Sequence, residues 1–520
     1  MRPTFLAFQT ASRALEASRA NIDVTGNNIA NVNTDGYSRQ RVDLSSISSG
    51  GFTQKYAVKG SAVGLGVSIS NISQIRDPFL DARFRNENAE SGKYDTLLSG
   101  LSDLERVFDE IDTQGLQSEL SNFINQLQTL SQTPTSNDIS LIVRTAAQKV
   151  AQIINVYSKQ VSEVREQQIY DLTNVVINND FNTKVKNIAS LNTQIREELT
   201  HGNTPNELFD KRNSLIDELS NIANIKVTTT PERISEDMTI ENLSISLYDA
   251  NSGRSIGIVQ NGLYNTLNVN QGSTSDSLKI EVISCFDAPE DTDITSSFSG
   301  GTIKGYLDLI NGNGTYATLG ENDFRGTLYY KKSMDTFAAN FAYVLNSVNG
   351  DGDGDIKKLF TDTAGGTQIT AANIRISSNW LNDPSYLTTT TVDPPTGEPD
   401  NVLRMISALN SDVSFVRNPY GTGTGSDASV MFRGTFSEYM SGTIGELALD
   451  IDLNHNFAET SNNVLSSLYN SREAISGVSL DEEGINLMAY QKSYNAAARY
   501  FTALDEAVDT IINRMGIVGR

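Results

Sequence analysis

The chain has 520 residues, of which 38% are hydrophobic and 20% are charged. That composition fits a globular protein of roughly two to four domains. Its formal net charge of −23 argues against a nucleic-acid partner, because binding a phosphate backbone requires a basic face and the sequence has no basic cluster. No run of about 18 apolar residues occurs, and the N-terminus lacks the pattern of a cleaved signal peptide. We therefore expect no membrane partner. If the protein is exported, we expect it to use a route other than general secretion.

Residue types that hold metals and cofactors are scarce. Cys285 is the single cysteine, so an intramolecular disulfide and a cysteine-based zinc site are excluded. The two histidines, His201 and His455, lie far apart in the sequence and in polar surroundings. No carboxylate pair or nucleophile–base set has a spacing that indicates catalysis. We expect no catalytic residue, no cofactor and no metal, and the sequence assigns no role to Cys285.

At both ends of the chain, apolar and small residues recur at alternating spacings of three and four, the pattern of an amphipathic helix. The C-terminal pattern is the longer one, with about four heptads. Helices with one apolar stripe need a partner, so we expect these two to pair with each other, to pack against other subunits, or both; the alternative is that they are core helices of one domain. The predicted interface residues are Phe8, Leu15, Ile22 and Ile29 in the first helix and Leu487, Tyr490, Tyr494, Phe501, Leu504, Val508, Ile511 and Met515 in the second.

Between the two ends, the hydrophobic periodicity changes. Helical spacing of apolar residues in 76–224, 301–350 and 434–479 predicts a helical bundle domain. Residues 225–300 instead alternate apolar and polar side chains with period two, and Asn261-Gly262 is a hairpin signal between two such runs. This region is therefore predicted to be β-rich.

A further inserted region and the two arms complete the predicted organisation. Turn-forming residues punctuate 351–433, which is predicted to be an outer, inserted β-rich domain in which Trp380 is a local core residue. Residues 1–75 and 480–520 are predicted to be the inner assembly arms. The expected fold class is an elongated α+β multidomain protein: terminal α-helices forming a coiled-coil-like arm, an α-helical bundle domain and β-rich outer regions.

Residues 26–41 read Gly-Asn-Asn-Ile-Ala-Asn-Val-Asn-Thr-Asp-Gly-Tyr-Ser-Arg-Gln-Arg, and this segment resembles the N-terminal signature of flagellar rod, hook and hook-associated proteins. Its Ser-Arg-Gln portion is similar to the version found in the hook-associated protein 1 family. Residues 207–220 resemble the bundle motif of that family, and residues 476–488 and 489–515 resemble the entry to its C-terminal helix and the helix itself. The terminal motif alone indicates an axial flagellar protein. Its combination with 207–220 indicates the hook-associated protein 1 family, the hook–filament junction proteins.

The resemblance implies a structural function and a set of partners. Subunits of that family form a ring between hook and filament, so the expected partners are other copies, the hook subunit, and a second junction protein on the filament side. A cytoplasmic export chaperone is expected to bind the C-terminal helix before the subunit leaves the cell through the flagellar type III secretion route. The expected location is the extracellular flagellum, at the hook–filament junction. Asn28 and Asn31 of the signature join the candidate assembly interface.

Other interpretations stay open. Asp351, Asp353 and Asp355 have the spacing of a calcium loop, with Asp362 at its twelfth position, but Ile356 stands where glycine is usual, which favours an acidic surface turn. The chain could also be another axial protein, such as a hook or rod subunit. An axial protein with an enzymatic outer domain is a further alternative, and it would need a deep pocket with perturbed carboxylates within 225–430.

Overall fold

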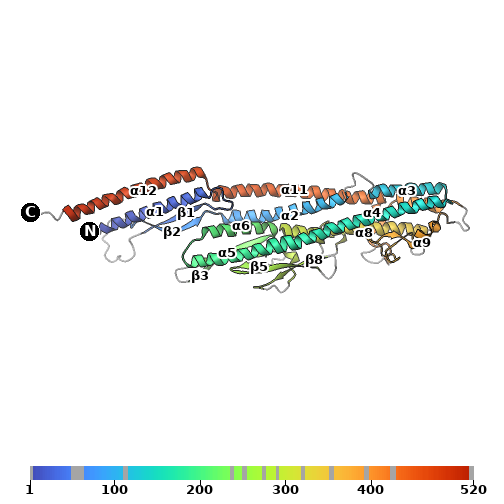
Figure 1. Ribbon diagram of the computed structural model, residues 1–520, viewed down its shortest axis with the longest axis horizontal. Helices are drawn as coiled ribbons and strands as arrows, with labels where there is room; N and C mark the ends of the chain where they lie inside the picture. Colours follow the sequence, from blue (N-terminus) through green and yellow to red (C-terminus); the bar gives the residue numbers. More distant parts are fainter. Residues whose placement is uncertain are drawn as a thin grey trace, which may run out of the picture.

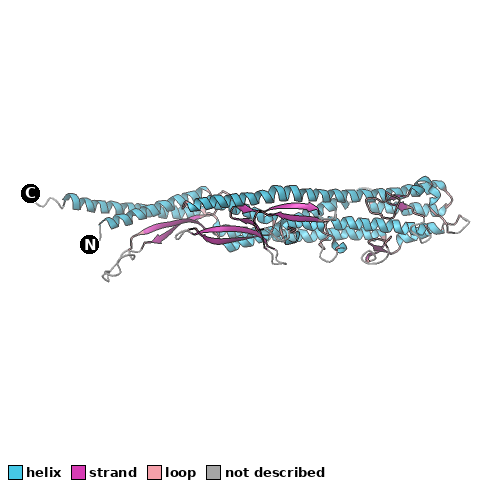
Figure 2. Ribbon diagram, turned by 90° about the horizontal axis from the view of Figure 1, so that it is seen from below, coloured by secondary structure: helices cyan, strands magenta, loops and turns pink. Residues whose placement is uncertain are grey.

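The computed structural model shows a long rod with both chain ends at the same end of the molecule (Figure 1). Helices run along almost the whole length of this rod, with the strands packed beside them (Figure 2). The structure describes residues 4–47, 64–108, 115–234, 239–248, 255–271, 277–287, 292–317, 322–350, 357–391, 397–421 and 429–514.

At the end of the rod that holds both termini, two helices lie side by side (Figures 1 and 2). They are α1 (Thr4–Ala30) and α12 (Leu480–Asp509), and α12 continues into a π-helical turn, Thr510–Arg514. Strands β1 (Gln40–Ser46) and β2 (Val67–Gln74) form an antiparallel hairpin that packs on α1. The first and last helices of the chain and this hairpin together make up the arm.

The rest of the rod is a body of long helices. Helix α4 (Asn137–Tyr170) continues through a π-helical segment (Asp171–Phe181) into α5 (Asn182–Thr200), because the residues between them keep right-handed helical backbone angles. Helix α11 (Phe436–Ser476) runs along α2 (Pro78–Phe108). The other helices of the bundle are α3 (Leu116–Gln132), α6 (Asn206–Ile222), α7 (Gly301–Asn311) and α8 (Thr327–Asn349).

A small antiparallel sheet packs against α5, with the strand order β3-β4-β5-β6. The turn between its last two strands lies at Asn261-Gly262, where Asn261 takes a positive φ of 56°. On β4, Leu243, Ile245 and Leu247 are buried at alternate positions. The strands are β3 (Ile225–Arg233), β4 (Thr239–Tyr248), β5 (Ser255–Gln260) and β6 (Leu263–Tyr264), and β7 (Thr266–Gln271) pairs separately with β8 (Leu278–Ile283).

The described residues of the body form two hydrophobic clusters, one after the other along the rod. The first, farther from the arm, packs the second half of α2 and the helices α3, α4 and α8 around residues such as Phe123 and Phe337. The second packs the π-helical segment, α5, α6 and α7 against the β-strands, around residues such as Phe181 and Ile245. On the long α4–α5 helix the first cluster ends at Val161 and the second begins at Leu172.

The range 351–433 differs from the expected β-rich domain. Its described strands are two to five residues long and form two separate two-stranded ladders. Its buried side chains, including Phe360, Trp380 and Phe415, belong to the first hydrophobic cluster. The apolar residues of this range thus pack on the helical bundle, whereas the turn signals at 393–395 and 422–425 lie outside the described residues. The elements are β9 (Phe360–Thr361), β10 (Arg375–Ile376), α9 (Ser378–Asn382), α10 (Asp400–Asn410), β11 (Val413–Val416) and β12 (Val430–Gly434), with short 3₁₀ turns at Thr295–Ser297, Gly314–Tyr316 and Pro384–Tyr386 along the body.

Replacing Trp380 tests whether this region belongs to the body's core. Its side chain is fully buried and contacts the Phe360 ring at a centroid distance of 6.0 Å. We expect Trp380→Ala to lower the free energy of unfolding of the body by about 3–5 kcal/mol, measured by urea denaturation with circular dichroism. The control is Leu381→Ala, because Leu381 is 52% exposed and should change stability by less than about 0.5 kcal/mol. Equal effects of both variants would show that the region folds apart from the bundle.

Candidate assembly arm

Helices α1 and α12 are antiparallel and touch along their length. Near the start of α1, the Phe8 ring packs edge-to-face on the Phe501 ring, with centroids 5.2 Å apart. Such a pair contributes about 0.5–1.5 kcal/mol beyond the area that it buries. In the middle of α1, the Ser18 hydroxyl donates to the Ser493 hydroxyl over 3.2 Å. Of the predicted interface residues, Phe8 and Phe501 are thus brought into direct contact.

The buried face of α1 consists of small and polar side chains. Ala11, Ser18, Thr25 and Asn28 are all buried, and small side chains allow neighbouring helices to approach closely. The larger predicted residues lie at the edge of this face and are half-buried: Phe8, Leu15, Ile22, Ile29 and, after the helix, Asn31. Within the predicted stripe, the smaller members are thus buried and the larger members lie at its edge.

Helix α12 is mostly uncovered. Among its side chains only Glu483 is buried. Of the predicted interface residues, Leu487, Tyr490, Leu504 and Val508 are half-buried, Tyr494, Phe501 and Ile511 are exposed, and Met515 lies outside the described residues.

The heptad pattern also missed five exposed apolar residues on this helix and the turn that follows it: Leu480, Ile485, Met488, Tyr500 and Ile512. Ile485 is 62% exposed and Met488 is 57% exposed. They lie off the stripe that faces α1, and the signal that could have found them is their apolar character at positions where a two-helix arm needs polar residues. Together with Tyr494, Phe501 and Ile511, these residues leave much of the apolar surface of α12 uncovered.

Asn28 of the signature motif ties three parts of the arm together. Its Nδ2 donates to the Gln40 carbonyl (2.9 Å) and to Glu483 Oε2 (3.2 Å). Its Oδ1 accepts from the Tyr37 hydroxyl (2.8 Å) and from the Gln40 N–H (3.0 Å). The buried amide thereby uses both of its donors and both of its acceptor positions, so an aliphatic side chain of the same size would leave several buried groups unpaired.

The segment after α1 is a turn that the motif residues build themselves. Asn31 Nδ2 donates to the carbonyl of Asn27 (3.0 Å) and to its side-chain oxygen (2.8 Å), which closes the end of the helix. Gly36 has a φ of +76°, a conformation that glycine adopts without strain. Burial, with the nearby carboxylates of Asp210 and Glu483, raises the pKa of Tyr37 to about 12, so its hydroxyl remains a donor at all physiological pH values.

Arg39 connects the motif to the start of α12. Its guanidinium group lies 2.8 Å from Glu483 and 2.9 Å from Glu482, and its backbone N–H donates to the Ser476 carbonyl at the end of α11. Glu482 is largely exposed, so its pair with Arg39 contributes little. Glu483 is buried and accepts from both Arg39 and Asn28, so it is the carboxylate that holds the two ends of the chain together.

Where the arm meets the body, ion pairs join three body helices. Arg76 binds both oxygens of Asp81 at 3.1 Å, at the start of α2. Asp217 on α6 accepts from Arg85 on α2 (2.7 Å) and from Arg472 on α11 (2.7 Å). The arm reaches this cluster through the Ser38 N–H, which donates to Asp210 on α6 at 3.3 Å, and burial raises the pKa of Asp210. The position of the arm is thus set largely by polar contacts.

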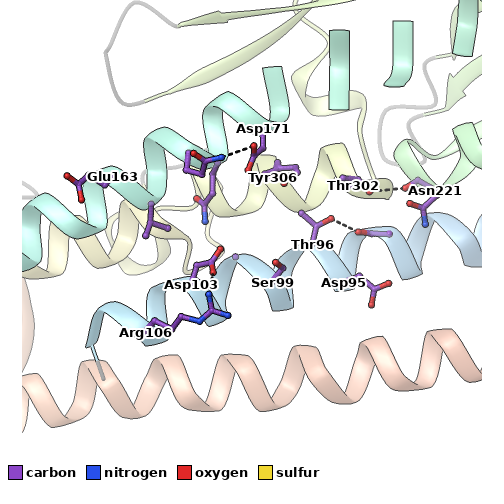
Figure 3. Close-up of a pocket in the computed structure, with 15 residues that line it drawn as sticks. Asp95, Thr96, Ser99, Asp103, Arg106, Glu163, Asp171, Asn221, Thr302 and Tyr306 are labelled. Atoms are coloured by element: carbon purple, nitrogen blue, oxygen red, sulfur yellow. Dashed lines mark hydrogen bonds and ion pairs between the residues drawn. The ribbon is translucent and has the colours of Figure 1, made fainter. Parts of the chain in front are cut away.

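An open groove of about 680 Å³ lies between α2, α4 and α7 (Figure 3). Its carboxylates come from two facing helices: Asp95 and Asp103 from α2, Glu163 from the end of α4 and Asp171 from the start of the π-helical segment that continues α4. Asp103 pairs with Arg106 at 3.0 Å. Within the described ranges, no three His, Cys, Asp or Glu side chains are close enough together to hold a metal ion.

The residues singled out for metal chemistry or reactivity lie apart from this groove. Asp351, Asp353 and Asp355 lie outside the described residues. The Asp362 carboxylate accepts backbone N–H groups of Ala364 and Gly366 at 2.8 and 2.7 Å, so it closes a local turn. His201, His455 and Cys285 are exposed.

Comparisons with known proteins identify the family. Residues 101–360 match the family described as Flagellar hook-associated protein FlgK helical domain. Flagellar hook-associated protein 1 of Bacillus subtilis (strain 168) is 30% identical to the chain over 530 residues, and the alignment covers all of both proteins. The chain belongs to the flagellar hook-associated protein 1 family.

Other relatives agree with this membership. Flagellar hook-associated protein 1 of Salmonella typhimurium is 24% identical, and that of Escherichia coli (strain K12) is 23% identical; each alignment covers 97% of the chain and 98% of the relative. The solved structure of the flagellar hook junction protein FlgK from Burkholderia pseudomallei superposes with a TM-score of 0.56 at 11% identity, covering 76% of the chain and all of that structure. The last comparison supports the α+β multidomain fold.

The arm and the body of the protein match different family descriptions. Residues 8–37 match the family described as Flagella basal body rod protein, and residues 472–515 match Flagellar basal body rod FlgEFG protein C-terminal. These segments contain most of α1 with its motif and α12, so the arm resembles rod proteins, whereas the body matches the helical domain of hook-associated protein FlgK. The hook-associated protein 1 family joins the flagellar hook to the filament, and the chain is a structural flagellar protein of that junction.

Removing the Asn28 amide tests the tie between the two ends of the chain. We expect Asn28→Ala to weaken the pairing of α1 and α12 by about 2–4 kcal/mol, because it removes hydrogen bonds from the buried Gln40 backbone groups and from Glu483 Oε2. The measurement is hydrogen exchange of the α12 amides, with the body helices as an internal reference. Asn33→Ala, at an exposed position of the same motif, should leave exchange unchanged. Equal exchange in both variants would contradict the role given to Asn28.

Proposed function

We propose that the subunit assembles as a ring between the hook and the filament through α1 and α12. The observation that carries this proposal is the uncovered state of α12, which has only one buried side chain and exposes apolar residues on more than one face. One face of the helix is already used for α1, so neighbouring subunits are the partners that would bury the others. The match of both arm segments to rod proteins supports this use of the arm.

The arm is expected to be only marginally stable in the free subunit. An isolated helix gains most of its stability from tertiary burial, and α12 has little of it. Contacts with neighbouring subunits would complete the burial and order the arm at the growing end of the flagellum. Because the arm would become fully ordered only during assembly, free subunits would associate less readily in the cytoplasm.

The proposed partners follow from the same surfaces. The hook subunit would contact the ring on one side, and a second junction protein on the filament side. An export chaperone would cover α12 before secretion through the flagellar type III route, which leads to the extracellular junction. The work of such a subunit is packing, so the proposal includes no catalysis, no nucleic-acid partner and no membrane partner. Among the described residues, no helix combines the length and the apolar character needed to span a membrane.

A hook or rod subunit is the nearest alternative, because those proteins share the arm segments. The body distinguishes the two possibilities, since residues 101–360 match the helical domain of the hook-associated family and form long packed helices. An enzymatic outer domain has no support from the cavity described above, which lies among the bundle helices.

Locating the protein on the flagellum tests the junction role. Antibody-gold label on isolated hook–basal bodies should lie only at the distal end of the hook. Cells lacking the gene should have hooks without filaments and should shed flagellin into the medium, because the filament has no attachment point. Label along the whole hook would assign the protein to the hook subunit class. Label absent from flagella would contradict a structural role altogether.

A charge placed on the exposed face of α12 tests the proposed interface. We expect Met488→Asp to abolish filament attachment, because it buries an unpaired carboxylate between subunits, and to leave the unfolding free energy of the free body within about 0.5 kcal/mol of the wild type. Swimming in soft agar and electron microscopy of flagella are the readouts. Leu403→Asp is the matched control, since Leu403 is similarly exposed on α10, in the part of the body farthest from the arm. Normal flagella with Met488→Asp would contradict this interface.

A further inference from the structure

The exposed large apolar side chains of the arm lie on two of its three parts. In the described part of the arm they occur on α12 with the turn that follows it and on the β1–β2 hairpin, and none lies on residues 6–30 of α1. On the hairpin they are Leu44, which is 46% exposed, and Ile69, which is 41% exposed. Single exposed apolar residues are ordinary on a protein surface, so it is the arrangement of these two that carries information.

Leu44 and Ile69 form a cross-strand pair. The register of the hairpin places Leu44 opposite Ile69 and Val42 opposite Ile72. Residues that are opposite each other, or two positions apart on one strand, share a face of a sheet, so all four side chains lie on the same face. The inner pair, Val42 and Ile72, is half-buried, whereas the outer pair is open.

The other face of the hairpin is polar. Arg41 and Asp43 alternate with the apolar residues of β1, and they pair with each other at 3.0 Å. This face suits solvent. A two-stranded hairpin by itself is only marginally stable, so it depends on the elements that cover its apolar face. In the free subunit that cover is incomplete at Leu44 and Ile69.

The hairpin and α12 lie on opposite sides of α1, which packs against both (Figures 1 and 2). The three parts also overlap along the arm. Asn28 binds both Gln40 at the start of β1 and Glu483 near the start of α12. About four turns earlier on α1, Arg13 donates to the carbonyl of Leu65 near the other end of the hairpin at 2.9 Å. Helix α12 passes the same length of α1 on its other side.

The exposed apolar residues of the two parts therefore lie at one level of the arm. Ile485 and Met488 follow Glu483 on α12, and Leu44 follows Gln40 on β1, both within the length that α1 shares with its two neighbours. Two copies placed side by side at this level present α12 of one to the hairpin of the next, with no shift along the rod.

The symmetry of a ring distinguishes this pairing from the alternative of α12 against α12. Contact between identical surfaces is isologous and closes a two-fold dimer, whereas a ring requires a heterologous contact between two different surfaces of each copy. One of these surfaces is α12. In the described part of the arm, the hairpin is the other part that exposes large apolar side chains, and it lies on the opposite side of α1.

We propose that the apolar face of the β1–β2 hairpin, hereafter the hairpin face, receives α12 of a neighbouring copy. This inference rests on the ring assembly proposed above, and it names the surface that covers α12. The contact buries Leu44 and Ile69 of one copy together with Ile485 and Met488 of the next. Each copy uses α12 on one side of α1 and the hairpin on the other, so the same contact repeats from copy to copy around the ring.

Photo-cross-linking in assembled flagella tests the contact in both directions. A benzophenone amino acid replaces Ile69 in one strain and Met488 in another. We expect both probes to give dimers of the chain. The Ile69 probe should link to a peptide of α12 in the second copy, and the Met488 probe should link to a peptide of the β1–β2 hairpin. This reciprocal pair of products separates the proposed contact from one between two α12 helices.

Two substitutions on β1 test the dependence on the hairpin face. In the Met488 probe strain, Leu44→Asp should lower the dimer yield at least about tenfold, because it buries an unpaired carboxylate against α12. Ser45→Asp places the same charge on the opposite face of the strand and should keep the yield within about twofold. Both residues are exposed in the free subunit, so the circular dichroism of the purified variants should match the wild type.

Each other outcome has one meaning. A Met488 cross-link to α12 of another copy would overturn the hairpin contact and leave the ring assembly standing. Equal dimer yields in the two aspartate variants, or an Ile69 cross-link only to a different protein, would also overturn the hairpin contact. Absence of dimers from both probes would overturn the assembly on which the inference rests.

Discussion

Asn28, Arg39 and Glu483 hold together residues that are separated by more than four hundred positions in the sequence, and the arrangement of the arm depends on this contact. The chain leaves the arm after β2, runs through the body and returns along α11, so its last helix lies beside its first only if the two ends are fixed at that point (Figure 1). Glu483 is the one buried side chain of α12, and it is charged. A buried carboxylate with two donors fixes position and register more strictly than an apolar contact of the same area, because the hydrogen bonds are directional.

The arm and the body are stabilised by different means. The body has two apolar clusters of its own, with aromatic side chains such as Phe123 and Phe181 fully buried, so it does not depend on the arm. The arm has a register set by polar groups and an apolar surface that remains largely uncovered. A stable body and an incompletely buried arm suit a subunit that must be folded before assembly and must bury more surface when it assembles. The polar connection through Ser38 and Asp210 keeps the two parts in contact without merging their cores.

Sequence periodicity predicted the helices of the arm because an amphipathic pattern is a local signal that a long helix repeats many times. It placed Phe8 and Phe501 on facing stripes, where the structure brings their rings together. The prediction favoured large residues as interface residues. In the structure, Leu15 and Ile22 lie at the edge of the contact, whereas the smaller Ala11 and Thr25 are buried within it. The region between α8 and α11 could not be assigned in this way, because its buried apolar side chains also pack against α3 and α4, which are distant in sequence.

The motif at 26–41 was recognisable as a pattern, but the four hydrogen bonds of Asn28 depend on where Gln40 and Glu483 lie in space. The groove between α2, α4 and α7 was also beyond local reasoning, because α2 and α7 must first pack together to form one wall. Glycine permits this approach: a Cβ at Gly305 would come within 2.8 Å of the Lys93 carbonyl, and one at Gly100 within 2.2 Å of the Leu309 side chain. With these two helices in contact and the end of α4 standing opposite, the space between them is bounded by the polar faces of three helices. The groove is therefore a fixed product of close helix packing, and its charge follows from which residues those faces carry.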